Sequence, residues 1–265
     1  MTEDTVPTLG DMVRDLSGEA GRIAARISPH WMQGRTAFGG ITAALALAAT
    51  RQALPGLPAL RSMQVSFLRP ISEHVAFEVE TIRAGRTSTF VQVDCISGDK
   101  LGARCTFVFG APRESAYAHD YGRAPDVPGP DDSPELLRRS SGPSFFKNFE
   151  ARLADGAQLA SGSDRPEMIV WTRLAAREDV DPEIAFICNA DNLPPAAMAT
   201  FHGGAPVSTV TWALDVARIP ADTDWQLTRT TSKHSAEGYS VQDMEIRDRG
   251  GDILASAQQL VALFA

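Results

Sequence analysis

The sequence contains few cysteines, no extended basic cluster and no long hydrophobic run, and each shortage excludes a class of protein. Its three cysteines, Cys95, Cys105 and Cys188, lie far apart among apolar residues and form no Cys-x-x-Cys pair. This setting predicts buried free thiols rather than disulfides or metal ligands. The net charge of −8 argues against nucleic acid as a partner. No segment approaches the ~20 apolar residues of a membrane span.

The amino terminus and the glycine pairs exclude further classes. The first residues, MTEDTVPTLGDMV, carry acids where a signal peptide needs basic residues, so we expect a cytoplasmic protein that does not bind membranes. Gly39-Gly40 and Gly203-Gly204 lack the spacing of a dinucleotide or phosphate-binding loop. The sequence therefore predicts neither a cofactor nor a metal. Its 265 residues, 43% of them hydrophobic, are enough for one large domain or two smaller ones.

The first half of the chain reads as one helix followed by an antiparallel meander. The segment TAFGGITAALALAATRQAL has only Thr42 as a polar residue between positions 41 and 49, which predicts a helix buried on nearly every side. Runs rich in Val, Phe and Thr then predict strands at 63–68, 75–82, 89–96 and 101–109. Because the turns between them are short, we expect the sheet to curl around the helix.

The second half repeats this order after a proline-rich connector. We expect a helix at 194–201 and strands at 207–214, 225–230, 239–246 and 253–264. The predicted domains are 1–111, a connector at 112–144, and 145–265. The predicted fold is of the α+β class, with two antiparallel sheets that each wrap around a central helix.

Three polar residues of the second half occupy places that are apolar in the first. Asp191 precedes the predicted second helix, where the first half has Gly39 or Gly40. A helix N-cap is the plain interpretation, but Pro194 and Pro195 place the cap after Asp191. A carboxylate near a positive helix end is favoured in its ionised form and can act as a base. A functional acid and an ordinary lead-in residue both remain open.

The other two residues lie on predicted strands. Gln259 is the one amide on an otherwise apolar face of the last strand, and a buried amide needs partners or a water-filled site. Thr209, on the strand after the predicted helix, is by itself an ordinary strand residue. A carboxylate, a hydroxyl and an amide can together hold one water for general-base hydrolysis. We therefore expect the reactive groups to converge within the second half.

The sequence resembles the acyl-CoA thioesterase II family over nearly its whole length apart from the connector. In the first half the likeness is carried by TAFGGITAALALAA, SMQVSFLRPISEHVAFEVETIRAGRTSTFVQV and GARCTFVFG. In the second half it is carried by WTRL, ICNADNLPPA, STVTWAL and ILASAQQL. This resemblance implies a double hotdog fold, in which each antiparallel sheet wraps a central helix.

The resemblance also implies a reaction. Family members activate a water against the thioester carbonyl with an Asp, a Thr and a Gln, which correspond by position to Asp191, Thr209 and Gln259. The products would be a free carboxylic acid and coenzyme A, formed without a metal, a cofactor or a covalent enzyme intermediate. Backbone N–H groups at a helix start are the natural donors to the carbonyl oxygen. The acyl chain would lie in the apolar space between sheet and helix.

Some positions leave alternatives or depart from the family pattern. Ser208 or Thr211 could supply the hydroxyl and Gln258 the amide, although strand alternation favours Gln259. Asn192 follows the aspartate where the family often has His, and the strand holding Thr209 lacks the usual aromatic-histidine run.

Two other functions stay open on sequence alone. A hotdog hydratase or dehydratase would use an Asp and His or a His and Glu pair, but none of the five histidines lies beside Asp191 in sequence: His30, His74, His119, His202 and His234. A non-catalytic acyl-CoA-binding protein is the second alternative. Because each sheet would have exposed edges, we also expect a homo-oligomer, at least a dimer.

Overall fold

The fold is built around one continuous antiparallel sheet rather than two separate ones. The computed structural model describes residues 6–19, 21–120, 122–136 and 142–264. Its 12-stranded sheet has the order β1-β2-β6-β7-β8-β5-β11-β14-β13-β12-β10-β9. The prediction of two sheets is corrected in this respect, because the inner edge strands of the two halves pair with each other. A two-stranded β3-β4 hairpin lies apart from this sheet.

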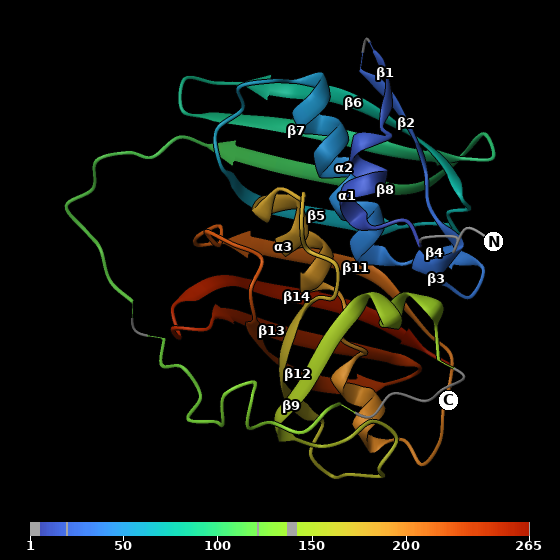
Figure 1. Cartoon of the computed structure of the whole chain (residues 1–265), viewed down its shortest axis with the longest axis vertical. Helices are drawn as coiled ribbons and strands as arrows, with labels where there is room; N and C mark the ends of the chain where they lie inside the picture. The colour runs from blue at the N-terminus through green and yellow to red at the C-terminus, as the bar shows by residue number, and fades with distance from the viewer. Residues whose placement is uncertain (1–5, 20, 121, 137–141, 265) are drawn as a thin grey trace.

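The first half contains the predicted central helix and meander, preceded by elements that the sequence did not reveal. Its elements are α1 (Leu9–Arg14), β1 (Ser17–Glu19), β2 (Arg22–Arg26), the short 3-10 helix η1 (Pro29–Trp31), β3 (Met32–Gln33), β4 (Thr36–Ala37), α2 (Gly39–Ala53), β5 (Leu60–Phe67), β6 (His74–Ala84), β7 (Ser88–Ser97) and β8 (Lys100–Gly110). The buried, Ala-rich α2 crosses one face of the sheet (Figure 1).

The second half has its central helix earlier in the chain than predicted. Its elements are η2 (Ser144–Asn148), β9 (Phe149–Gly156), β10 (Glu167–Leu174), α3 (Pro182–Ala190), η3 (Ala196–Thr200), β11 (Val207–Val216), β12 (Gln226–Ala236), β13 (Tyr239–Asp248) and β14 (Ile253–Leu263). The α-helix predicted at 194–201 is wrong, since only a short 3-10 helix forms there. The true helix starts with Asp181 as N-cap and Pro182 in its first turn, a favoured start signal.

The two halves join through their inner strands and their central helices. In the sheet, β5 pairs with β11, and Val65 stands opposite Trp212. The helices α2 and α3 pack antiparallel, because the start of α2 lies against the carbonyl of Cys188 near the end of α3. Figure 1 shows both helices on the same side of the sheet. The main hydrophobic core is therefore shared by both halves.

At the other end of the helix pair, an ion pair ties the two halves together. Arg51 of α2 makes a double contact with Glu183 of α3, through Nε at 2.8 Å and Nη2 at 2.7 Å. Glu183 also accepts the Leu60 N–H at 3.0 Å, and the Arg51 guanidinium lies 4.7 Å from the Phe109 ring centroid. The Glu183 side chain is only 10% exposed, and without Arg51 its carboxylate would lie buried without this cationic partner.

The later part of the connector, residues 127–136, packs against the second half. The Trp171 indole N–H donates to the Pro128 carbonyl at 2.9 Å, on the outer face of the sheet. The Leu136 N–H donates to Ala151 of the outermost strand, β9. In the described part of the chain, the sheet ends in the short β1 on one side and in this partly covered β9 on the other. Assembly into a homo-oligomer stays a prediction.

The cysteines agree with their prediction, because all three are free and buried. In the described ranges, no helix has the length and apolar character that crossing a membrane requires.

Replacing Arg51 by Met should lower the free energy of unfolding by about 3 kcal/mol, since it leaves the buried Glu183 carboxylate unpaired while keeping an aliphatic stem. Arg104→Met is the control, because Arg104 pairs with Asp94 on an exposed part of the sheet and should cost less than about 1 kcal/mol. Urea denaturation measures both. Equal losses in the free energy of unfolding would contradict the larger stabilisation assigned to the Arg51–Glu183 pair.

Candidate active site

Asp191 lies at the end of α3, and its carboxylate meets the start of α2 from the other half. Asp191 is the C-cap residue of α3 and is only 9% exposed. The Gly40 N–H, in the first turn of α2, hydrogen-bonds to the carboxylate. The expectation that Asp191 precedes its own helix is thus wrong, yet the carboxylate does face a positive helix end. That end belongs to the first half of the chain.

Gln259 holds the Asp191 carboxylate from the side of the sheet. Its Nε2 donates to Asp191 Oδ1 at 2.6 Å, and both side chains are buried. Strand alternation puts the neighbouring Gln258 on the opposite face, where its amide donates to Asp243 at 3.2 Å. Gln259, which strand alternation favoured over Gln258, is therefore the amide that contacts Asp191.

A β-bulge brings Thr209 to the same face as Gln259. In the pairing of β11 with β14, Trp212 stands opposite Gln259 and Thr209 opposite Val261, with a register shift between Thr209 and Thr211. Val261 is fully buried, so Thr209 faces the inner side of the sheet even though it is three residues from Trp212. A bulge resets alternation in this way. Thr211, the alternative hydroxyl, is exposed beyond the bulge.

Asp191 and Thr209 share a cavity of about 250 Å³. Its walls come from both halves, although the three predicted polar residues, Asp191, Thr209 and Gln259, all belong to the second half. The lining residues are Gln33, Thr36, Ala37, Gly39, Thr42, Phe67, Leu68, Arg69, Pro70, Ile71, Asp191, Val207, Ser208 and Thr209. Ser208, the other alternative hydroxyl, lies at its exposed rim. Among the described residues, no histidine lines this cavity.

The surroundings of Asp191 make it a carboxyl that can hold or release a proton near neutral pH. Burial raises the pKa of Asp191 to about 7, and the hydrogen bonds from Gln259 and the Gly40 N–H offset part of that rise. Burial disfavours the charged form, whereas donors to the carboxylate favour it. A carboxyl with this pKa suits general-base chemistry, because the best catalytic pKa lies near the working pH.

Gly39 is a site residue that the sequence did not assign. A Cβ added at Gly39 would lie 2.5 Å from Asp191 Oδ2 and 3.0 Å from Phe67 Cζ. Only a glycine therefore lets the helix start approach the acid so closely. On sequence alone Gly39 is a possible counterpart of Asp191 in the first half, whereas in the structure it lies against the Asp191 carboxylate. The Gly-Gly pair at the start of the predicted helix is the sequence signal for this close approach.

A buried polar network supports the segment that carries Asp191. The Asn189 amide donates to Gln226 at 2.8 Å and to the Thr172 hydroxyl at 3.1 Å. Asn192 in turn donates to the Asn189 side-chain oxygen at 3.0 Å. The amide that follows the acid is thus engaged with α3, and it helps to fix the end of that helix.

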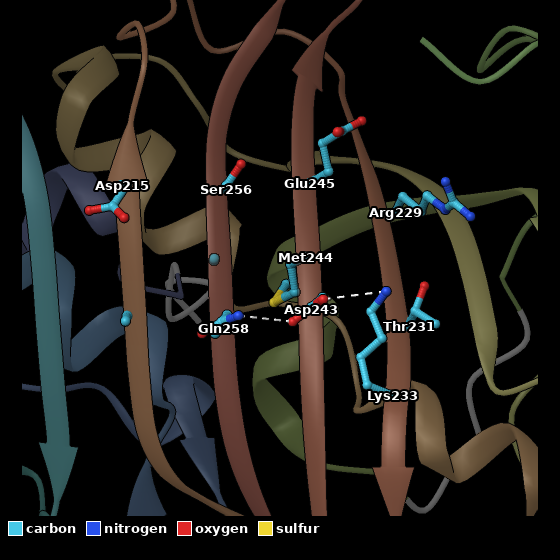
Figure 2. A pocket seen from close by; sticks show the side chains of 11 residues that line it. Asp215, Arg229, Thr231, Lys233, Asp243, Met244, Glu245, Ser256 and Gln258 are labelled. Carbon is cyan, nitrogen blue, oxygen red and sulfur yellow. Dashed lines mark hydrogen bonds and ion pairs between the residues drawn. The ribbon is translucent and has the colours of Figure 1, made fainter. Parts of the chain in front are cut away.

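A larger hollow of about 550 Å³ lies on the outer face of the second half (Figure 2). Charged side chains from β12 and β13 border it, with Lys233 3.4 Å from Asp243. Arg229 and Asp215 there are exposed, so this hollow lacks the buried acid that distinguishes the inner cavity. In the part of the chain described by the structure, no three or more His, Cys, Asp or Glu residues form a group that could hold a metal ion.

Comparison with known proteins gives matches in both halves. A model of the acyl-CoA thioesterase N-terminal domain matches residues 27–110. A model of the acyl-CoA thioesterase C-terminal domain matches residues 122–263. No curated protein matches the sequence at a significant level.

Solved structures share the whole fold. A conserved protein of unknown function with a hot dog fold from Alicyclobacillus acidocaldarius has a TM-score of 0.88 at 24% identity, covering 98% of this chain and 99% of that one. A putative thioesterase II from Thermobifida fusca has a TM-score of 0.84 at 19% identity, covering 97% and 98%. An acyl-CoA thioesterase II from Mycobacterium marinum has a TM-score of 0.77 at 19% identity, covering 97% and 98%. These similarities show the double hotdog fold.

The raised pKa of Asp191 predicts a stability cost that grows with pH. As pH rises from about 4 to about 7, the unfolded carboxyl loses its proton while the folded one keeps it, so this group destabilises the folded protein increasingly over that range. At pH 8, Asp191→Asn should therefore be more stable than the wild type by a few kcal/mol. Denaturation at pH 4 and pH 8 measures the difference, which should be small at pH 4. A variant equally or less stable than wild type at pH 8 would contradict this account.

Proposed function

Because the chain belongs to the acyl-CoA thioesterase II family, we propose that it hydrolyses an acyl-CoA thioester to a free carboxylic acid and coenzyme A. The observation that carries the proposal is the buried Asp191 carboxylate, held by Gln259 and by the start of α2 inside a cavity that opens to solvent.

In the proposed reaction, Asp191 acts as a general base on water. The carboxylate takes a proton from a water whose oxygen attacks the thioester carbonyl carbon, and a tetrahedral intermediate forms. Its collapse breaks the C–S bond, and the thiolate of coenzyme A leaves and takes up a proton. Gln259 orients the carboxylate through its 2.6 Å hydrogen bond. Thr209, in the same cavity wall, supplies a hydroxyl to position the water.

The negative charge that develops on the carbonyl oxygen needs hydrogen-bond donors. The Gly40 N–H is engaged with Asp191, which leaves the Gly39 N–H, at the start of α2 and in the cavity wall, as the proposed donor. The positive end of this 15-residue helix stabilises the same charge.

The contacts of Asp191 favour hydrolysis over the lyase alternative. A hydratase or dehydratase of this fold would pair the acid with a histidine, whereas the groups at hydrogen-bonding distance here are an amide and a backbone N–H. A non-catalytic acyl-CoA binder would keep the cavity but would not need a carboxylate that changes its protonation near pH 7. An activity measurement separates these functions.

The direct test is release of free thiol from a panel of acyl-CoA substrates. Asp191→Asn should lower kcat/KM by roughly 10²- to 10⁴-fold, the usual loss when a general base is removed. Gln259→Ala should lower it by at least about tenfold, because a misplaced base loses its alignment. Gln258→Ala is the matched control, since its amide lies on the opposite face, and it should keep the wild-type rate.

The pH dependence gives a second readout that a purely structural role for Asp191 would not produce. The wild-type kcat/KM should rise as pH increases through about 7, where Asp191 becomes ionised. The residual rate of Asp191→Asn should lack this step. Wild-type activity in Asp191→Asn would place the base elsewhere, and no thiol release from any substrate would favour the binder.

A further inference from the structure

The inner cavity has a closed side and an exposed rim. Thr42 (1% exposed) and Ile71 (2%) close it toward the core. At the rim, Leu68 is 50% exposed, and the next residue, Arg69, also lines the cavity and is exposed. A thioester that reaches Asp191 therefore enters past this rim. The charged part of coenzyme A stays outside, because the buried core cannot take an unpaired charge.

A second arginine lies close to this rim, at the tip of the β3–β4 hairpin. Gln33 and Thr36 pair with each other and both line the cavity, and the hairpin loop between them carries the exposed Arg35. The hairpin is fixed to the segment that follows Arg69, because the Thr36 hydroxyl accepts the Ile71 N–H at 3.0 Å. Arg35 and Arg69 therefore come from two neighbouring loops at one opening.

Neither of these guanidinium groups has an acid as its partner. Elsewhere on the sheet, the exposed Arg22 and Arg104 are paired with carboxylates. Among the residues that the structure describes, no carboxylate forms an ion pair with Arg35 or Arg69. Arg69 Nη1 donates to the Leu101 carbonyl at 3.0 Å. This bond holds the side chain at the end of the sheet and leaves Nε and Nη2 for a ligand.

The charges next to these arginines do not cancel them. Glu73, the acid nearest to Arg69 in the sequence, lies 3.8 Å from Arg26. Asp99 and Lys100, in the turn before β8, carry opposite charges and offset each other. The rim of the cavity is therefore locally positive on a protein whose net charge is −8.

A local positive charge at this place matches the chemistry of coenzyme A. The molecule carries a diphosphate and a phosphate monoester, and the monoester alone has a charge of about −1.5 to −2 at neutral pH. A substrate and a protein of the same sign repel each other at long range, so binding requires cations close to the site. An arginine without an acid partner presents paired N–H donors that fit phosphate oxygens.

The cavity wall also offers an amide for the uncharged part of coenzyme A. Gln33 lines the cavity and is partly buried. Within the described ranges, its side chain makes no hydrogen bond. The pantetheine arm, which links the thioester sulfur to the diphosphate, contains amide groups that can pair with such a side chain. The wall and rim thus supply a base, an amide and two cations, one for each chemical part of an acyl-CoA.

We propose that Arg35 and Arg69 form the subsite for the phosphates of coenzyme A, and that Gln33 binds the pantetheine arm. This inference rests on the proposed hydrolysis, because it assigns the part of the same site that recognises the leaving group. Since the subsite is exposed and ionic, added salt weakens it.

The test compares two thioesters that carry the same acyl group, one of coenzyme A and one of pantetheine, which lacks the phosphates. The readout is the ratio of their kcat/KM values, which does not depend on the folded fraction of a variant. Arg69→Gln and Arg35→Gln should each lower this ratio by about tenfold, because a charge-assisted contact with a phosphate is lost. Added salt should lower the ratio of the wild type more than that of the double variant.

Arg83→Gln is the matched control. Arg83 is exposed and near the far end of β6, roughly 30 Å along the strand from its start beside the rim segment. The variant removes the same charge from the same half of the chain and should keep the wild-type ratio. Arg69→Lys keeps the charge but loses the paired donors, so its ratio should lie between those of the wild type and Arg69→Gln.

The outcomes separate this subsite from the proposed function. An unchanged ratio in the double variant, or an equal fall in Arg83→Gln, would overturn the subsite while leaving hydrolysis standing. If no thioester is hydrolysed, the proposed function fails, and calorimetric titration with coenzyme A decides the subsite. The Kd should then rise about tenfold in Arg69→Gln and stay unchanged in Arg83→Gln. Equal Kd values in Arg69→Gln and the wild type, or no binding by the wild type, would overturn it.

Discussion

The structure depends on the contact between the Asp191 carboxylate and the start of α2. The acid comes from the end of one central helix and the backbone donors from the beginning of the other. The carboxylate is buried, so its ionised form needs every donor that the fold supplies. The Gly40 N–H, the Gln259 amide and the positive end of α2 are those donors. Burial and donors act in opposite directions, and their balance sets a pKa near neutrality.

This contact exists only because the two halves are joined in a particular way. The β5–β11 pairing makes one sheet, and the antiparallel α2 and α3 bring opposite helix ends together at two junctions. One junction holds Asp191 at the start of α2. The other holds the Arg51–Glu183 ion pair, which binds Leu57, Pro58 and Leu60 backbone groups as well. We interpret the first junction as the proposed active site and the second as a contact that stabilises the joined halves.

Much of this arrangement was predictable from local patterns. The alternation of apolar and polar residues in the last strand identified Gln259, because successive side chains of a strand point to opposite faces and every second residue faces the core. The meanders were located well, and the resemblance to the acyl-CoA thioesterase II family is confirmed by the family matches in both halves. The catalytic roles of Asp191, Thr209 and Gln259 stay predictions, although the structure brings Asp191 into contact with Gln259 and into one cavity with Thr209.

What local patterns could not reveal depends on contacts between distant segments. The helix at 182–190 is buried on nearly every side, so its sequence shows no helical alternation of apolar and polar residues. The sequence instead predicts the helix at 194–201, where the Pro-Pro pair resembles a helix start. The bulge beside Val210 resets the alternation that would otherwise place Thr209 outside. The approach of Gly39 to Asp191 spans the two halves, and no spacing in the sequence encodes it.

The most direct test of the central claim is a single methyl group at the helix start. Gly39→Ala places a Cβ 2.5 Å from Asp191 Oδ2, so it should displace the carboxylate and lower thioester hydrolysis by about 10²-fold in a folded protein. Gly129→Ala, where a Cβ meets no atom within 4 Å, should keep the wild-type rate. A fully active Gly39→Ala enzyme would contradict the account, because the contact between acid and helix would then be dispensable.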